Sequence, residues 1–401
     1  MLPAAASDTS LGIFGNANED GTINIQDVEY TQRIILGFDD QTELADAKYD
    51  HQIDILDVTQ TELTILGREK ELTILDSADR IVTVDMPVER VIGVDNGAVE
   101  ILRALGVNVE EKMAGVSTYI LKNLQYWPQL KEKTGFEFMR LDYEKIVELN
   151  PDLILLYKSS PGYTNMEKLE ELGVTALCLN FYDARELDDN VRILGEIFTA
   201  KERMGEYISW YHNYDDLIIN RTGRLEAEAK PHVLYLSYPD NCYPTLKVIT
   251  DSSNDHPLIV NAGGINIAAD LIGGTTVVVD GEWIVEQNPD VIIVKVLGGS
   301  FTGYSANEAE ALENMKVMRD TLMADPALGA TKAVKDGNVF IMCTDLNKAA
   351  VHVVGTAYLA KCFHPELFED IHPESILEEY YEEWQGVPYQ GVYVYPPLAE
   401  N

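Results

Sequence analysis

The chain has 401 residues, of which 67 are acidic and 30 basic, so its net charge is −37 at pH 7. This negative field disfavours nucleic acid and anionic membranes as partners and favours cations and basic protein surfaces. Hydrophobic residues make up 46% of the chain, which suffices for a full core, and the length predicts two or three domains. No apolar run reaches the roughly 18–20 residues of a membrane helix. The four scattered cysteines match neither a zinc signature nor a dense disulfide framework.

Residues 15–37 and 45–67 form an internal repeat with an offset of 30 residues, and each copy ends in Ile-Leu-Gly. The first copy has the spacing of a calcium loop. Its oxygen-bearing residues at loop positions one, three, five, seven, nine and twelve are Asn16, Asn18, Asp20, Thr22, Asn24 and Asp27. Calcium takes about six to eight oxygen ligands, so this spacing predicts a calcium site, with Gly21 expected to take a positive φ at the sharp turn. A helix should follow Asp27, with Val28, Ile34 and Ile35 on its apolar face.

The second copy is less complete. Its candidate ligands at positions one, five, seven, nine and twelve are Asp46, Asp50, Gln52, Asp54 and Asp57. Lys48 stands at position three, where an ammonium repels a cation unless it points away or replaces the metal. His51 stands at position six. The alternative for either loop is an acidic turn without a metal.

From about Glu71 onward, strands and helices alternate, which predicts mainly parallel sheets covered by helices on both faces. The expected strands are 90–94, 112–116, 153–157, 174–179, 232–236, 291–296 and 339–342. The expected helices are 97–105, 143–149, 166–172, 283–287 and 348–361. Residues 144–155 are echoed by 282–293 through a helix, an Asn-Pro-Asp turn and a buried strand, which predicts two similar lobes.

A long helix is expected to join the lobes. Thr199 and Glu202 have the spacing of a capping box, and apolar residues recur at helical intervals to about residue 228. A helix over 199–228 would be roughly 40 Å long and would restrict hinge motion to small angles. The predicted domains are therefore a calcium module (1–70), a first lobe (71–198), the bridging helix (199–228) and a second lobe (229–401).

Several stretches are similar to the cluster-A, or class III, substrate-binding proteins of ABC importers. They are RIVTV (80–84), PVERVIGVDNGAVEILRALGV (87–107), DYEKIVELNPDLILLY (142–157), NAGGINIAADL (261–271), GEWIVEQNPDVIIVKV (281–296) and AKCFHPELFEDI (360–371). The resemblance covers about residues 72–395 and implies an α/β fold of two Rossmann-like lobes bridged by one helix. It also implies an iron–siderophore complex, haem or vitamin B12 as ligand, and an ABC permease as partner.

The paired loops at the front resemble a dockerin, a small all-α module with EF-hand-type calcium loops. That resemblance implies one or two structural calcium ions and a cohesin-like protein partner. A dockerin-like front followed by a class III binding protein resembles the arrangement in archaeal members of the family. The beginning of the chain lacks the features of a signal peptide, so we expect an extracytoplasmic protein whose secretion signal is not in this chain.

Ligands of open α/β sheets bind beyond the carboxyl ends of the strands, and this rule selects the candidate binding residues. In the first lobe they are Asp95, Asn96, Tyr119, Arg140, Lys158 and Tyr163. In the second lobe they are Tyr238, Asn241, Cys242, Tyr243, Asn266, Trp283, Tyr304 and Thr344. Aromatic faces suit a bulky flat or chelated ligand, and Arg140 and Lys158 suit anionic groups.

These features favour capture of a small ligand in an interlobe cleft over catalysis. The sequence contains no GxSxG, HExxH or P-loop motif. Two alternatives stay open at this point. One is a dockerin-bearing extracellular enzyme of the glycoside hydrolase type, which would need two facing carboxylates. The other is a cell-surface scaffold protein with a degenerate cleft.

Overall fold

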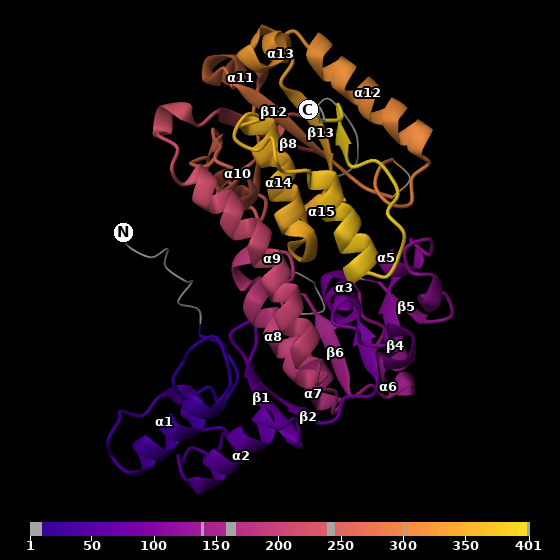
Figure 1. Ribbon diagram of the computed structural model, residues 1–401. Coiled ribbons are helices and arrows are strands. Elements are labelled where there is room, and N and C mark those ends of the chain that lie inside the picture. The colour runs from indigo at the N-terminus through magenta and orange to yellow at the C-terminus, as the bar shows by residue number, and fades with distance from the viewer. Residues whose placement is uncertain (1–9, 138–139, 158–165, 239–244, 300, 399–401) are drawn as a thin grey trace. The chain divides into compact units, whose positions relative to one another are not determined.

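The computed structural model describes residues 10–137, 140–157, 166–238, 245–299 and 301–398 (Figure 1). The chain forms two compact units. The first unit comprises Met1–Phe181 and Arg185–Ile208, and the second comprises Tyr182–Ala184 and Ser209–Asn401. The first unit therefore contains both the front repeat and the first α/β lobe, and the predicted division at residue 70 does not coincide with a boundary between compact units.

Two matching helices follow the two front loops, α1 (Ile25–Ile35) and α2 (Ile55–Ile65). Each begins at a reciprocal capping box, in which the Asn24 or Asp54 side chain pairs with the third residue of its helix. The two helices pack together over a small core that contains Ile34. Val28 and Ile34 are buried as predicted, whereas Ile35 is 42% exposed and does not belong to the apolar face.

A β-hairpin that the sequence analysis did not predict lies between the front helices and the first lobe (Figure 1). Its antiparallel strands are β1 (Glu71–Leu75) and β2 (Ile81–Asp85). The chain just before the first loop lies beside β1, where Ile13 and Ile74 form an antiparallel bridge. Both of these side chains are fully buried.

The first lobe contains a five-stranded parallel sheet in the order β5-β4-β3-β6-β7. Its strands are β3 (Val91–Gly93), β4 (Met113–Ser117), β5 (Thr134–Phe136), β6 (Leu153–Leu156) and β7 (Ala176–Cys178). The connecting helices are α3 (Asn96–Ala104), α4 (Val109–Lys112), α5 (Thr118–Leu121), α6 (Tyr143–Leu149), α7 (Met166–Glu171) and α8 (Leu187–Ile197). The predicted α/β alternation is confirmed in this lobe.

The second lobe contains a seven-stranded mixed sheet. Its strands are β8 (His232–Tyr238), β9 (Lys247–Ile249), β10 (Ile265–Asn266), β11 (Thr276–Val278), β12 (Val291–Val296), β13 (Val339–Cys343) and β14 (Val394–Tyr395). Strands β8, β10, β12 and β13 are parallel, while β9, β11 and β14 pair antiparallel. Its helices are α10 (His256–Asn261), α11 (Gly281–Gln287), α12 (Glu308–Ala324), α13 (Lys332–Asp336), α14 (His352–Phe363) and α15 (Pro373–Glu379).

The Asn-Pro-Asp echo corresponds to the same structural unit in each lobe. Asn150 and Asn288 end α6 and α11 in the left-handed conformation, with φ of 45° and 44°. Asp152 then accepts backbone hydrogen bonds from Glu89 and Arg90 at 2.8 Å, before β3. Asp290 accepts one from His232 at 2.9 Å, at the start of β8. In both lobes the aspartate aligns the new strand with its neighbour.

The bridging helix is shorter than predicted. Helix α9 spans Lys201–Thr222, 22 residues, or about 33 Å, and it begins in the first unit and ends in the second. Thr199 does not cap it. With φ of 53°, Thr199 instead ends α8, because its N–H donates to Glu196 and the Ala200 N–H donates to Gly195. Among the residues described, no helix is both long and apolar enough to cross a membrane.

Candidate functional site

Loop one contains a buried oxygen that fits a cation ligand. Asn16 is fully buried, and its Nδ2 donates to the carbonyls of Leu11 at 2.9 Å and Asp20 at 2.6 Å. These two bonds assign the amide orientation and leave Oδ1 without a hydrogen bond within the described structure. A buried unpaired oxygen costs about 1–3 kcal/mol. A calcium ion at this first loop position would supply the missing partner.

Asp27 closes the same loop. It is fully buried, and its two carboxylate oxygens accept the backbone N–H groups of Asn18 at 3.2 Å and Asn24 at 2.8 Å. Burial raises the pKa of Asp27, the two backbone donors oppose this, and the nearby Asp20 raises it further. A bound cation would reverse the effect, because it favours the ionised carboxylate.

The remaining predicted ligands of loop one belong to the same network. Asn18 Nδ2 donates to Asp20 at 2.9 Å, the Thr22 N–H donates to Asp20 at 2.7 Å, and Asn24 Nδ2 donates to the Thr22 hydroxyl at 2.9 Å. The prediction for Gly21 is wrong, since its φ is not positive. Glu19, at position four, takes the left-handed conformation instead, with φ of 56°.

Loop two closes at position twelve in the same way. Asp57 accepts the N–H groups of Lys48 at 2.9 Å and Asp54 at 2.8 Å. Burial raises the pKa of Asp57, these two hydrogen bonds oppose the rise, and the nearby Asp46 and Asp50 add to it. Position one differs from loop one, because Asp46 already accepts the N–H groups of Asp50 at 3.0 Å and His51 at 2.7 Å. The Lys48 side chain is exposed.

The composition of the loops limits the metals that they suit. In the described part of the chain, no group of three or more His, Cys, Asp or Glu side chains is placed to hold a metal ion. Loop one instead combines two carboxylates with asparagine, threonine and backbone oxygens. An all-oxygen set of this kind suits calcium and not a transition metal.

In the first lobe, two candidate side chains beyond the strands are exposed. Tyr119, on α5 just after β4, is 59% exposed, with the Lys122 ammonium 5.6 Å from its ring centre. The Arg140 side chain is also exposed, and its backbone N–H donates to Glu137. Asp95, in contrast, is buried and caps α3 by accepting the Gly97 N–H at 2.9 Å. Asn96 is half-buried at the start of the same helix.

In the second lobe, several candidates are held by the fold. Tyr238 and Tyr304 are buried. Asn266 donates to the Ile249 carbonyl at 3.2 Å and accepts the Ala268 N–H at 3.0 Å. Trp283 packs against the lobe core, and the Thr344 hydroxyl accepts the Gly298 N–H at 3.2 Å. Their role in ligand binding remains a prediction. Five further candidates lie outside the described residues: Lys158, Tyr163, Asn241, Cys242 and Tyr243.

A buried polar cluster in the second lobe was not predicted. Lys295, near the carboxyl end of β12, pairs with the buried Asp255. Asn347 donates to Asp255 at 2.7 Å and to the Tyr235 hydroxyl at 2.7 Å. Burial lowers the pKa of the nearby His352 to about 4, although Asp255 and Asp183 oppose the shift. These residues are far apart in the chain, so no local pattern indicates the cluster.

The sequence profile of the periplasmic binding proteins matches residues 91–346, a span that begins in the first lobe and ends in the second. The chain belongs to this family. The predicted α/β class is thereby confirmed for the two lobes.

Three relatives show the range of the family. The uncharacterized ABC transporter substrate-binding lipoprotein YvrC of Bacillus subtilis is 26% identical over 228 residues, which are 55% of this chain and 68% of that protein. The ferric-anguibactin-binding protein FatB of Vibrio anguillarum is 23% identical over 271 residues, covering 64% and 75% of the two chains. The molybdate-binding protein MolA of Haemophilus influenzae is 20% identical over 349 residues, which are 79% of this chain and 92% of that protein. Its solved structure aligns with a TM-score of 0.63 at 18% identity and covers 80% of this chain and 99% of its own. All three names describe binding proteins, and this gives no support to the enzyme alternative.

Proposed function

We propose that this extracytoplasmic binding protein captures an iron chelate, either a siderophore complex or haem, or a corrinoid, and delivers it to an ABC import permease. The strongest support is that the profile of the periplasmic binding proteins matches a part of the chain that spans both α/β lobes. At the strand ends of the first lobe, an exposed tyrosine and an exposed arginine offer an aromatic face and a positive charge.

The charge balance of the second lobe favours a bulky ligand over a small oxyanion. Lys295 is paired with Asp255, and Lys348 lies 3.6 Å from Asp345. Each of these cations is already balanced by a carboxylate, so neither adds a net positive charge for an anion. A large chelate or corrinoid gains its affinity mainly from apolar and aromatic contact, which needs few free charges.

A ligand panel tests this function. Calorimetric titration of the full chain with a ferric catecholate, haem, cyanocobalamin and molybdate should give binding by one of the first three. If the ligand is an anionic chelate, Arg140→Gln should lower the affinity for it by about 10–100-fold, which is the effect of losing one charged hydrogen bond. Arg33→Gln is the matched control, because Arg33 is an exposed arginine of the front module that pairs with Asp39.

The other outcomes separate the alternatives. Binding of molybdate alone would contradict the chelate proposal. Failure of every ligand would support the scaffold alternative. If both a neutral corrinoid and an anionic chelate bind, equal losses of affinity in Arg140→Gln would mean that Arg140 has a structural role.

We also propose that the front repeat (residues 12–67) is a dockerin-like module in which loop one binds calcium. The buried Asn16 oxygen and the buried Asp27 carboxylate support this site. Asn16, Asn18, Asp20, Asn24 and Asp27 would hold the ion through side-chain oxygens, and Thr22 would hold it through its carbonyl. Calcium would supply a positive charge that ties the loop together. A second ion in loop two is the less supported part of the proposal. Both oxygens of Asp46, at position one, already accept hydrogen bonds, whereas Asn16 Oδ1 at the same position of loop one has no partner within the described structure.

Exposed apolar side chains on the front module support a protein partner of the cohesin type. They occupy equivalent positions in the two copies, with Ile25 61% and Ile55 64% exposed, and Leu36 67% and Leu66 64% exposed. Phe38 is 70% exposed. Large apolar side chains repeated in this way on a surface are typical of a docking site.

We expect purified cohesin modules to bind the calcium-loaded chain. Leu36→Asp combined with Leu66→Asp should weaken the complex at least about tenfold, because each buried leucine contributes about 1.5–3 kcal/mol. Val317→Asp is the control, because Val317 is a 53% exposed apolar residue on α12, outside the front module. Surface plasmon resonance measures the affinities. Self-association of the chain without cohesin binding, seen by sedimentation, would assign the apolar residues to a second copy instead.

A further inference from the structure

The ligand residues of loop one also hold the chain segment that precedes the loop. Asn16 donates to the Leu11 carbonyl at 2.9 Å, and the Leu11 N–H donates to the Asp20 carbonyl at 3.0 Å. Leu11 is almost fully buried. The position of residues 11–14 therefore depends on the ordered loop.

This segment pairs with β1 of the hairpin through one antiparallel β-bridge, between Ile13 and Ile74. The Phe14 N–H donates to the Thr73 carbonyl at 2.9 Å, and the Leu75 N–H donates to the Gly12 carbonyl at 2.7 Å. An isolated two-stranded hairpin is at best marginally stable in water. This hairpin therefore depends on the elements that pack on it.

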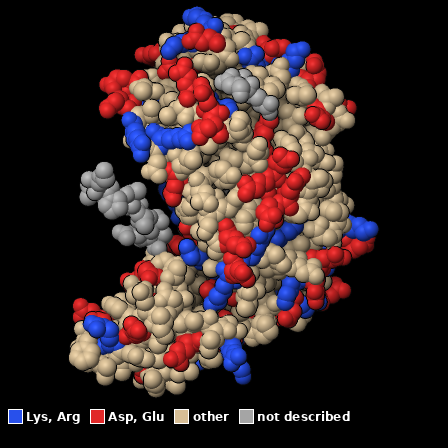
Figure 2. Space-filling view, viewed as in Figure 1, with Lys and Arg blue, Asp and Glu red and all other residues tan. Residues whose placement is uncertain are grey.

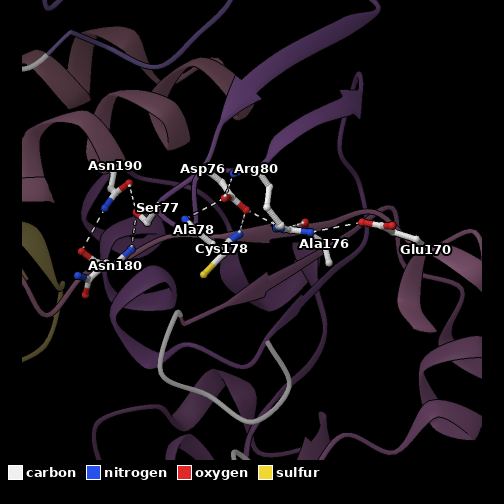
Figure 3. A network of polar contacts seen from close by, with 9 residues as sticks. All are labelled: Asp76, Ser77, Ala78, Arg80, Glu170, Ala176, Cys178, Asn180 and Asn190. Carbon is white, nitrogen blue, oxygen red and sulfur yellow. Dashed lines mark hydrogen bonds and ion pairs between the residues drawn. The ribbon is translucent and has the colours of Figure 1, made fainter. Parts of the chain in front are cut away.

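The turn of the hairpin (residues 76–80) holds the edge of the first-lobe sheet, as Figure 3 shows. Asp76 is almost fully buried and accepts hydrogen bonds from the N–H groups of Ala78 at 2.9 Å and Cys178 at 3.1 Å. Arg80 pairs with Asp76 at 2.7 Å and donates to the Ala176 carbonyl at 2.8 Å. The Ser77 N–H donates to the Cys178 carbonyl at 2.9 Å. The hairpin turn thus covers strand β7.

Helix α2 provides a second connection between module and lobe. Gln60 donates to the Glu71 carbonyl at 2.7 Å, at the start of β1. The Lys201 ammonium, in the first turn of α9, donates to the Thr64 carbonyl at 2.9 Å and lies 2.7 Å from the Glu196 carboxylate. Lysine is favourable at the carbonyl end of α2.

We infer that calcium bound at loop one stabilises the β7 edge of the first-lobe sheet through residues 11–14 and the β1–β2 hairpin. The inference rests on the proposed calcium site and goes beyond it, because the front module then acts as a calcium-dependent part of the lobe. Breaking the hairpin away from β7 would disturb the segment that the loop holds in place. Calcium would therefore have to leave before the edge can open.

Hydrogen exchange of the full chain, followed by mass spectrometry, tests the inference. With calcium at about 100 times its Kd, amides whose opening requires calcium release should exchange about 100-fold more slowly than in the calcium-free chain. We expect this for the Phe14, Leu75, Ser77 and Cys178 amides, and no change for β12 in the second unit. Slowing confined to residues 11–27 would overturn the inference while leaving the calcium site intact. Absence of calcium binding in a direct titration would overturn both.

A steric variant tests the route. A Cβ added at Gly12 would lie 2.9 Å from the Leu75 carbonyl oxygen, so Gly12→Val should separate the segment from β1 without touching a calcium ligand. This variant should still bind calcium but should lose the slowing at Ser77 and Cys178. Gly205→Val is the control, because a Cβ added at this position in α9 has no atom within 4 Å outside the backbone of its own helix. Persistent slowing at Cys178 in Gly12→Val would overturn the proposed route.

Discussion

Replacing Asp76 with asparagine is expected to lower the free energy of unfolding of the first unit by about 3–5 kcal/mol, the cost of removing one partner of a buried ion pair. The Asp76 carboxylate accepts the N–H groups of Ala78, Arg80 and Cys178 and the Arg80 guanidinium. An amide of the same size has only one oxygen for these donors. The NH₂ group of the asparagine is itself a donor, so it cannot accept hydrogen bonds from the groups that face it. A buried backbone N–H and part of the Arg80 guanidinium would therefore be left unpaired.

Urea unfolding of the full chain, followed by circular dichroism, measures this loss. Glu170→Gln is the matched control, because Glu170 is an exposed carboxylate that contacts the same arginine at 3.5 Å. An exposed pair of this kind contributes about 0–1 kcal/mol. If Asp76→Asn and Glu170→Gln were equally mild, the network of Figure 3 would not hold the hairpin to the lobe.

Calcium at about 100 times its Kd is expected to stabilise the first unit by about 2.7 kcal/mol at neutral pH, and Asp27→Asn should abolish this gain. Asp57→Asn, the equivalent change in loop two, should preserve the contribution of loop one. Thermal unfolding with calcium and with a chelator measures the difference. An equal calcium response in wild type and Asp27→Asn would contradict the assignment of loop one.

The stabilisation by calcium should fall in acid. Burial raises the pKa of Asp27 above its ordinary value of 3.8. In the calcium-free protein, protonated Asp27 therefore favours folding at low pH, and this contribution is lost as the pH rises through the folded-state pKa. Calcium requires the ionised form, so its effect should be full above that pKa and should vanish below it. A calcium response unchanged from neutral to acid pH would exclude Asp27 as a ligand.

Local spacing explains which predictions are confirmed. The Asn-Pro-Asp echo predicted a helix, a turn and a buried strand in each lobe, and both copies have these elements. A left-handed asparagine before a proline depends on neighbouring residues alone, so sequence is enough to indicate it. The helix predicted after the first front loop from its apolar residues is likewise present, as α1.

Predictions that depend on distant partners needed the structure. Thr199 and Glu202 have the spacing of a capping box, yet Thr199 takes a left-handed conformation and its N–H donates to the Glu196 carbonyl, so it ends the preceding helix. Asn266 is predicted as a ligand residue in a Gly-Gly-Ile-Asn turn, but in the structure it lies in β10 and its side chain is hydrogen-bonded to Ile249 and Ala268. Position along the chain does not show whether a polar group is already paired.

The calcium-loop spacing, the twin lobes and the family resemblance were therefore determined by the sequence itself, because each depends on residues close together in the chain. The tertiary structure decided that Asp255 balances Lys295, that Asn16 has a buried unpaired oxygen, and that the front module joins the edge of the first lobe. Each of these depends on which distant backbone and side-chain groups meet after the chain folds, and hydrophobic periodicity carries no information about such pairings.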